Sequence, residues 1–142
     1  MADEVFTKEA CERIKQAIVE AEKLTSGELH VHLSKHSKDP YKDAIKAFNV
    51  LGMQNTKLRN GVLFFFATKD HRFAVIGDKG INDIVHQDFW NDVVDKIAKG
   101  FAAGTPIDAL CDAITLCGSK LQHYFPIQAD DQNELSDDVT TD

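Results

Sequence analysis

Residues 59–83 read RNGVLFFFATKDHRFAVIGDKGIND, which is two apolar runs separated by a short polar turn. Residues 62–67 are apolar at every position. A strand covered on one face alone would alternate, so we predict a strand buried on both faces. Residues 69–71 predict a turn and residues 73–76 a second strand, which makes the pair a β-hairpin. The Gly-Asp-Lys-Gly corner at residues 77–80 then opens a helix.

The rest of the chain adds one more strand and several helices around this hairpin. Residues 28–34 alternate between apolar and polar side chains, as in a strand with two different faces. Apolar residues at helical spacing predict four helices, near residues 8–24, 41–51, 81–101 and 105–125. The first two strands are joined through a helix, so they can lie parallel, whereas the hairpin makes the third antiparallel. We therefore predict an α/β fold: a three-layer α/β/α sandwich with a small mixed β-sheet flanked by helices on both faces.

Composition sets the domain organisation. A chain of 142 residues with 43% hydrophobic and 27% charged residues is typical of one globular domain. The net charge of −7 argues against nonspecific binding to nucleic acid. Six acidic residues and no Lys or Arg lie between residues 130 and 142. We predict a single domain over residues 1–126 and an acidic, flexible, solvated tail over residues 127–142.

The sequence also bears on the compartment. The first residues carry neither a basic segment nor an apolar one of the kind found in signal peptides, and no apolar run is long enough to span a membrane. The three cysteines form no C-x-x-C pair, so neither a disulfide framework nor a zinc knuckle is indicated. We expect a cytoplasmic monomer without contact to a membrane.

Several segments together resemble the TPM domain family, named after a thylakoid-lumen protein, a photosystem repair protein and a nematode receptor-associated protein. The similar segments, in chain order, are Ser26-Gly27-Glu28-Leu29-His30-Val31, Arg59-Asn60-Gly61-Val62-Leu63-Phe64-Phe65, Gly77-Asp78-Lys79-Gly80-Ile81, Phe101-x-x-Gly104 and Ala109-Leu110-x-x-Ala113-Ile114. The resemblance as a whole covers about residues 7–126, and the family's mixed sheet between helical layers agrees with the fold predicted above.

The resemblance implies two functions. Some members bind a divalent cation such as calcium near acidic loop residues or act as accessory factors, and some are described as acid phosphatases. Because no catalytic signature is found, we favour a binding or accessory module without strong catalytic activity. The alternative is a weak metal-dependent acid phosphatase, in which a metal-activated water hydrolyses a phosphate monoester.

Acidic and amide side chains near strand ends are the candidate cation ligands. Calcium, and to a lesser extent magnesium, takes oxygen ligands of this kind. The candidates are Asp78, Asn82 and Asp83 at the corner, with Asp39 and Asp43 after the first strand. The alternatives stay open: Asp78 or Asn82 can cap a helix, and Asp39 and Asp43 can be ordinary exposed charges.

Basic residues are concentrated between residues 35 and 59, a stretch that contains six Lys and Arg residues but two acidic ones. This patch can attract a phosphate, an acidic protein or the chain's own tail, or it can be a solvated helix face. We single out Arg59 as the phosphate or anion ligand because its planar guanidinium suits an oxyanion. His30 and His32 share one face of the first strand, where they can ligate zinc or be hydrogen-bonded core residues.

Overall fold

The computed structural model describes residues 5–127 and 136–142. Its helices are α1 Lys8–Glu22, α2 Pro40–Val50, α3 Lys79–Asn82, α4 Asp88–Ala103 and α5 Pro106–Tyr124, with a short 3-10 turn η1 Met53–Asn55. Its strands are β1 Glu28–Ser34, β2 Gly61–Ala67, β3 Arg72–Gly77 and β4 Thr140–Thr141.

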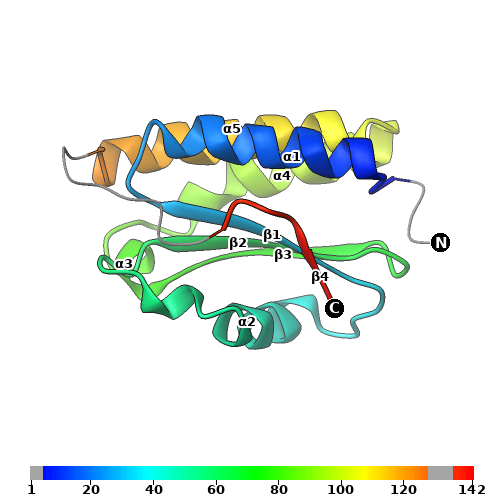
Figure 1. The fold of residues 1–142 in the computed structure, drawn as a ribbon, viewed down its shortest axis with the longest axis horizontal. Coiled ribbons are helices and arrows are strands. Elements are labelled where there is room, and N and C mark those ends of the chain that lie inside the picture. The colour runs from blue at the N-terminus through cyan, green and yellow to red at the C-terminus, as the bar shows by residue number, and fades with distance from the viewer. Residues whose placement is uncertain (1–4, 128–135) are drawn as a thin grey trace.

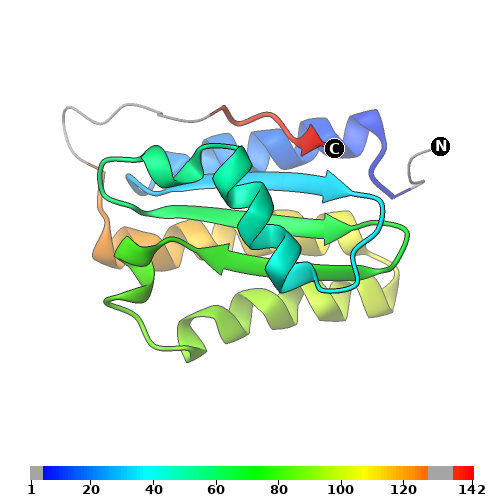
Figure 2. The ribbon, with the colours of Figure 1, turned by 90° about the horizontal axis from the view of Figure 1, so that it is seen from below.

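The strands form one mixed sheet in the order β3-β2-β1-β4. β1 and β2 are parallel, β2 and β3 form the antiparallel hairpin, and β4 is parallel to β1. Helices α1, α4 and α5 cover one face of this sheet and α2 covers the other (Figures 1 and 2). The predicted α/β/α sandwich is confirmed.

Strand β2 lies at the centre of the fold and is buried along its whole length. Alternate residues point to opposite faces. Phe64 and Phe66 pack into the core beneath α1, α4 and α5, whereas Leu63 and Phe65 pack against α2. The uninterrupted apolar run is therefore explained by two separate cores, one on each face of the sheet.

The long helix predicted after the corner is interrupted, which corrects that expectation. The single turn α3 ends at Asn82, and α4 begins at Asp88. The Asn82 side chain spans the break, because its Nδ2 donates to the Gly77 carbonyl at 2.7 Å and its Oδ1 accepts from Trp90 Nε1 at 3.2 Å. Ile84, expected on the buried face, is half exposed in the loop between the two helices.

The end of the chain differs from the flexible tail predicted over residues 127–142. Thr140 and Thr141 pair in parallel with His32 and Leu33, and Asp142 N donates to the Leu33 carbonyl at 3.2 Å. An uncovered β1 would leave such backbone groups without partners in the sheet. Residues 128–135, with Asp130, Asp131 and Glu134, lie outside the described residues, and the domain boundary at residue 126 stays a prediction.

Residues 140–142 also cover the two histidines of β1. Thr140 Oγ1 lies 2.8 Å from His30 Nε2 and 2.7 Å from His32 Nδ1. The Asp142 carboxylate is 2.6 Å from His32 Nε2 and also accepts from Ser34 Oγ. Both histidines are buried, so the structure favours hydrogen-bonded core residues over zinc ligands.

Replacing Thr140 by valine tests this arrangement. Valine keeps the shape of the side chain but removes the hydroxyl, which leaves His30 and His32 each without one partner. We expect Thr140→Val to lower the free energy of unfolding by about 1.5 kcal/mol. Thr141→Val is the matched control, since Thr141 is exposed, and should change it by less than about 0.5 kcal/mol. Equal effects in urea denaturation would contradict the bridging role.

Candidate functional site

The corner at residues 77–80 is held by an ion pair. Arg59 donates two hydrogen bonds to the Asp78 carboxylate, from Nε at 2.7 Å and from Nη2 at 2.9 Å. The same carboxylate accepts from Lys79 N at 2.7 Å and so caps α3. This pairing raises the pKa of Arg59 above its ordinary value. Asp78 is buried, so its oxygens are already committed within the chain.

The other two corner residues are also engaged. Asn82 uses both ends of its amide to join Gly77 and Trp90. The Asp83 carboxylate lies on the surface, 2.6 Å from Lys79 Nζ one helical turn away. The corner thus combines a helix cap, a bridge across the break and a surface ion pair.

The remaining predicted ligands lie at the opposite end of the sheet. Asp39 caps α2 by accepting from Lys42 N at 3.1 Å, and Asp43 accepts from Ser37 Oγ at 2.6 Å. They follow the carboxyl end of β1, whereas Asp78 follows β3, which runs the other way. The structure therefore does not bring the five predicted ligands together.

A residue that sequence reasoning missed joins the group at the carboxyl end of β1. Asp70, in the β2–β3 turn, accepts from Ser37 N at 2.7 Å and lies 3.0 Å from His36 Nδ1. The pKa of Asp70 is lowered, chiefly by its hydrogen bond with the His36 side chain and next by the one that it accepts from Ser37 N. Two carboxylates from different elements thus meet at Ser37. The usable signal was that this turn follows β2, which is parallel to β1 and ends beside it.

These side chains line an open depression of about 680 Å³. The residues that line it are His36, Ser37, Lys38, Asp43, Asp70 and Arg72. Arg72 Nη1 donates to the carbonyl oxygens of Ser37 and Lys38, both at 3.1 Å. The depression thus offers carboxylate, hydroxyl and carbonyl oxygens, which are the ligands that calcium and magnesium prefer.

The same depression does not form a complete cage of protein ligands. Within residues 5–127 and 136–142, no group of three or more His, Cys, Asp or Glu side chains is placed to hold a metal ion. A cation there would need the Ser37 hydroxyl, backbone carbonyls or water besides the carboxylates of Asp43 and Asp70. Calcium sites commonly include such ligands.

Arg59 is predicted to bind an anion. In the structure its guanidinium is paired with the carboxylate of Asp78.

The cysteines do not have the properties of a nucleophile. Burial raises the pKa of Cys117 to about 12 and raises that of Cys11 and Cys111 above the ordinary value. A thiolate nucleophile is therefore disfavoured at all three positions.

Similar proteins agree with this architecture. The family model of the TPM domain matches residues 2–120. The NMR structure of the BA42 protein from the psychrophilic bacterium Bizionia argentinensis superimposes with a TM-score of 0.92 at 42% sequence identity, covering 100% of this chain and 99% of that one. No curated protein matches the chain. No helix in the described part of the chain has the length and apolar character to cross a membrane. With the family model matching most of its length, the chain belongs to the TPM domain family.

Proposed function

We propose that this TPM domain is a binding or accessory module that takes a divalent cation, calcium or less favourably magnesium, where β1 and β2 end. The observation that carries the proposal is the convergence of Asp43 and Asp70 on Ser37. One carboxylate comes from the first turn of α2 and the other from the hairpin turn. Calcium sites in proteins commonly include Asp and Glu carboxylates together with other oxygen ligands.

Charges of both signs lie around this depression. The lowered pKa of Asp70 keeps its carboxylate ionised in mildly acidic solution. Asp39 lies at the start of the same helix and adds a third negative charge near the depression. Lys38 and Arg72 also line the depression and oppose a cation by charge, and Arg72 occupies two carbonyls that could serve as ligands. We therefore expect weak binding, with a Kd on the order of 10⁻³ M.

An amide NMR titration of the full chain with Ca²⁺, and separately with Mg²⁺, tests the proposal. We expect saturable shifts confined to residues 36–43 and 69–72. Asp43→Asn and Asp70→Asn should each weaken binding about tenfold, equivalent to about 1.4 kcal/mol. Asp83→Asn is the matched control, because it removes an exposed carboxylate from the corner.

Three outcomes are informative. Shifts at residues 77–83 that Asp83→Asn abolishes would move the cation to the corner. Flat titrations with both ions would refute cation binding by this domain. Hydrolysis of a phosphate monoester that depends on Ca²⁺ and on Asp70 would favour the phosphatase alternative over an accessory module. The cytoplasmic location, the monomeric state and an acidic partner for the basic patch stay predictions of the sequence.

A further inference from the structure

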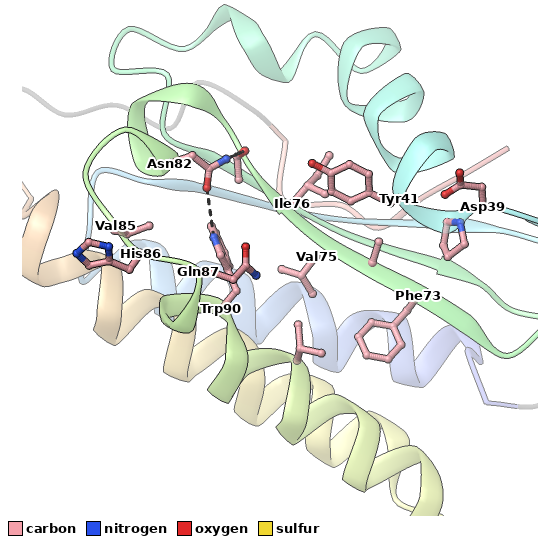
Figure 3. Close-up of a pocket in the computed structure, with 14 residues that line it drawn as sticks. Asp39, Tyr41, Phe73, Val75, Ile76, Asn82, Val85, His86, Gln87 and Trp90 are labelled. Carbon is pink, nitrogen blue, oxygen red and sulfur yellow. Dashed lines mark hydrogen bonds between the residues drawn. The ribbon is translucent and has the colours of Figure 1, made fainter.

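Strand β3 forms the outer edge of the sheet on the side away from β4. A groove of about 570 Å³ runs along it. Its floor is the stretch from Phe73 to Gly77, and its walls are the start of α2, at Asp39 to Tyr41, and the segment from Asn82 to Val94. Figure 3 shows Tyr41 on the α2 side of this strand and Trp90 on the α4 side.

The backbone of β3 presents hydrogen-bonding groups to this groove. Asp78 N donates to the Gly61 carbonyl at 2.9 Å, and bonding directions alternate along an antiparallel pair. Ala74 and Ile76 therefore bond to β2, while Phe73, Val75 and Gly77 face outward. The Gly77 carbonyl agrees with this alternation, because it points away from β2 and accepts a hydrogen bond from the Asn82 side chain.

The outward-facing backbone N–H and C=O groups of Phe73 and Val75 lack a partner of the kind that the Gly77 carbonyl has in Asn82, within the part of the chain that the structure describes. Within the described part of the chain, no backbone group outside the hairpin bonds to them. Exposed edges are commonly protected by Pro, Lys or a bulge. The stretch from Phe73 to Ile76 has neither residue type and pairs with β2 without a bulge. The strand is therefore an open template for pairing.

The walls define the side chains that would fit. On the α4 side Phe73, Val75, Trp90 and Val94 form an apolar stretch, and Asn82, His86 and Gln87 line its other end. On the α2 side Tyr41 is 63% exposed although it is a large aromatic residue. Among the described residues that line the groove, Asp39 is the one with a formal charge, and none is Lys or Arg. The groove thus combines an apolar wall with a negative end.

We propose that this groove binds an extended peptide of a partner protein, which adds to β3 as a further strand. The backbone groups of Phe73 and Val75 bond to the peptide. Alternate apolar side chains of the peptide pack against Trp90 and Val94, and a basic side chain faces Asp39. The proposal does not rest on cation binding at the depression, although both proposals use the charge of Asp39.

Two other occupants fit less well. A second copy would bring the same apolar wall and the same Asp39 to the contact, so its groove offers no Lys or Arg to that carboxylate. The chain's own tail carries negative charge like Asp39, and its residues Thr140 and Thr141 already pair with β1 on the opposite edge. An extended peptide of basic or neutral character matches the charge of the groove, whose charged lining residue is Asp39.

The probe is a synthetic peptide, acetyl-Lys-Val-Lys-Val-Lys-Val-Lys-amide, titrated into the full ¹⁵N-labelled chain. We expect saturable shifts of the Phe73 and Val75 amides and of the Trp90 indole, with a Kd on the order of 10⁻⁴ M. A peptide with Glu in place of Lys should bind at least about tenfold more weakly. A peptide N-methylated at each Val should show no saturable binding if those amides pair with β3, and the complementary N-methyl-Lys peptide covers the opposite register.

A pair of variants on α2 provides the internal control. Tyr41→Ala removes a wall of the groove and should weaken peptide binding about fivefold. Val50→Ala, on the same helix and 86% exposed away from the groove, should leave it unchanged. Absence of shifts at millimolar peptide, equal binding of all the peptides, or sedimentation as a dimer that blocks the Phe73 and Val75 amides would each overturn the proposal.

Discussion

Gly80→Ala is expected to lower the free energy of unfolding by about 3 kcal/mol, at the upper end of the range for overpacking. A Cβ at this position would lie 2.5 Å from the Arg59 carbonyl oxygen and still closer to that of Leu58. Both neighbours are backbone atoms, so a rotamer change cannot relieve the clash. Gly80 N also donates to the Arg59 carbonyl at 2.8 Å, which fixes the close approach.

Urea denaturation followed by far-UV circular dichroism measures this loss. Gly104→Ala is the matched control, since Gly104 has a φ of +81° but no atom within 4 Å of the added Cβ. It should cost only the backbone strain of a left-handed residue, about 1 kcal/mol. Losses of equal size would show that crowding at the corner is not what requires glycine at residue 80.

Glu22→Gln is expected to raise the free energy of unfolding by about 2 kcal/mol in mildly alkaline solution, because the folded chain must keep a proton on Glu22 that the unfolded chain releases. Glu22 ends α1, and its Oε2 accepts from Leu29 N at 2.8 Å. Burial, with a further contribution from a side-chain hydrogen bond to Asp137, raises the pKa of Glu22 to about 10. A glutamine keeps a donor for Asp137 and an acceptor for Leu29 N without a proton to lose.

The sign of the pH dependence follows from the raised pKa. Folding holds the proton on Glu22, so this stabilisation is complete below the ordinary pKa of 4.5 and is lost as the pH rises toward about 10. Unfolding curves at about pH 6 and about pH 9 fall inside this window. The native chain should lose stability between them, and Glu22→Gln should lose less.

An exposed carboxylate on the same helix provides the comparison. Glu20 pairs with Lys23 at the surface, so Glu20→Gln should leave the pH dependence of the native chain intact. If Glu22→Gln and the native chain lost stability in parallel between the two pH values, the proton on Glu22 would not be the source of the pH dependence.

Much of the fold could be predicted because its signals are long and periodic. The apolar run at residues 62–67 indicated a central strand, and the helix between the first two strands indicated their parallel pairing. Strand β4 could not be predicted, since two threonines in an acidic segment have no periodicity of their own. The available signal was indirect: His30 and His32 formed a polar face on a strand that needed a cover.

The candidate site was harder to predict because it depends on strand direction. Asp78 and Asp39 both follow strands, but an antiparallel strand ends at the opposite end of the sheet, which separates them. Asp70 was interpreted only as a turn residue. Its meeting with Ser37 depends on the close approach of two loops, and no local pattern in the sequence encodes that distance.

The position of β4 has a consequence for how the chain is made. Thr140 and Thr141 leave the ribosome after every other strand, although they pair with β1 near the beginning of the chain. Until then β1 is an unprotected edge on a nascent domain, a stage at which chains are prone to associate. Residues 140 and 141 therefore close an edge of the sheet that stays open while all the earlier elements are made, and a chain shortened before residue 140 would expose β1 as well as β3.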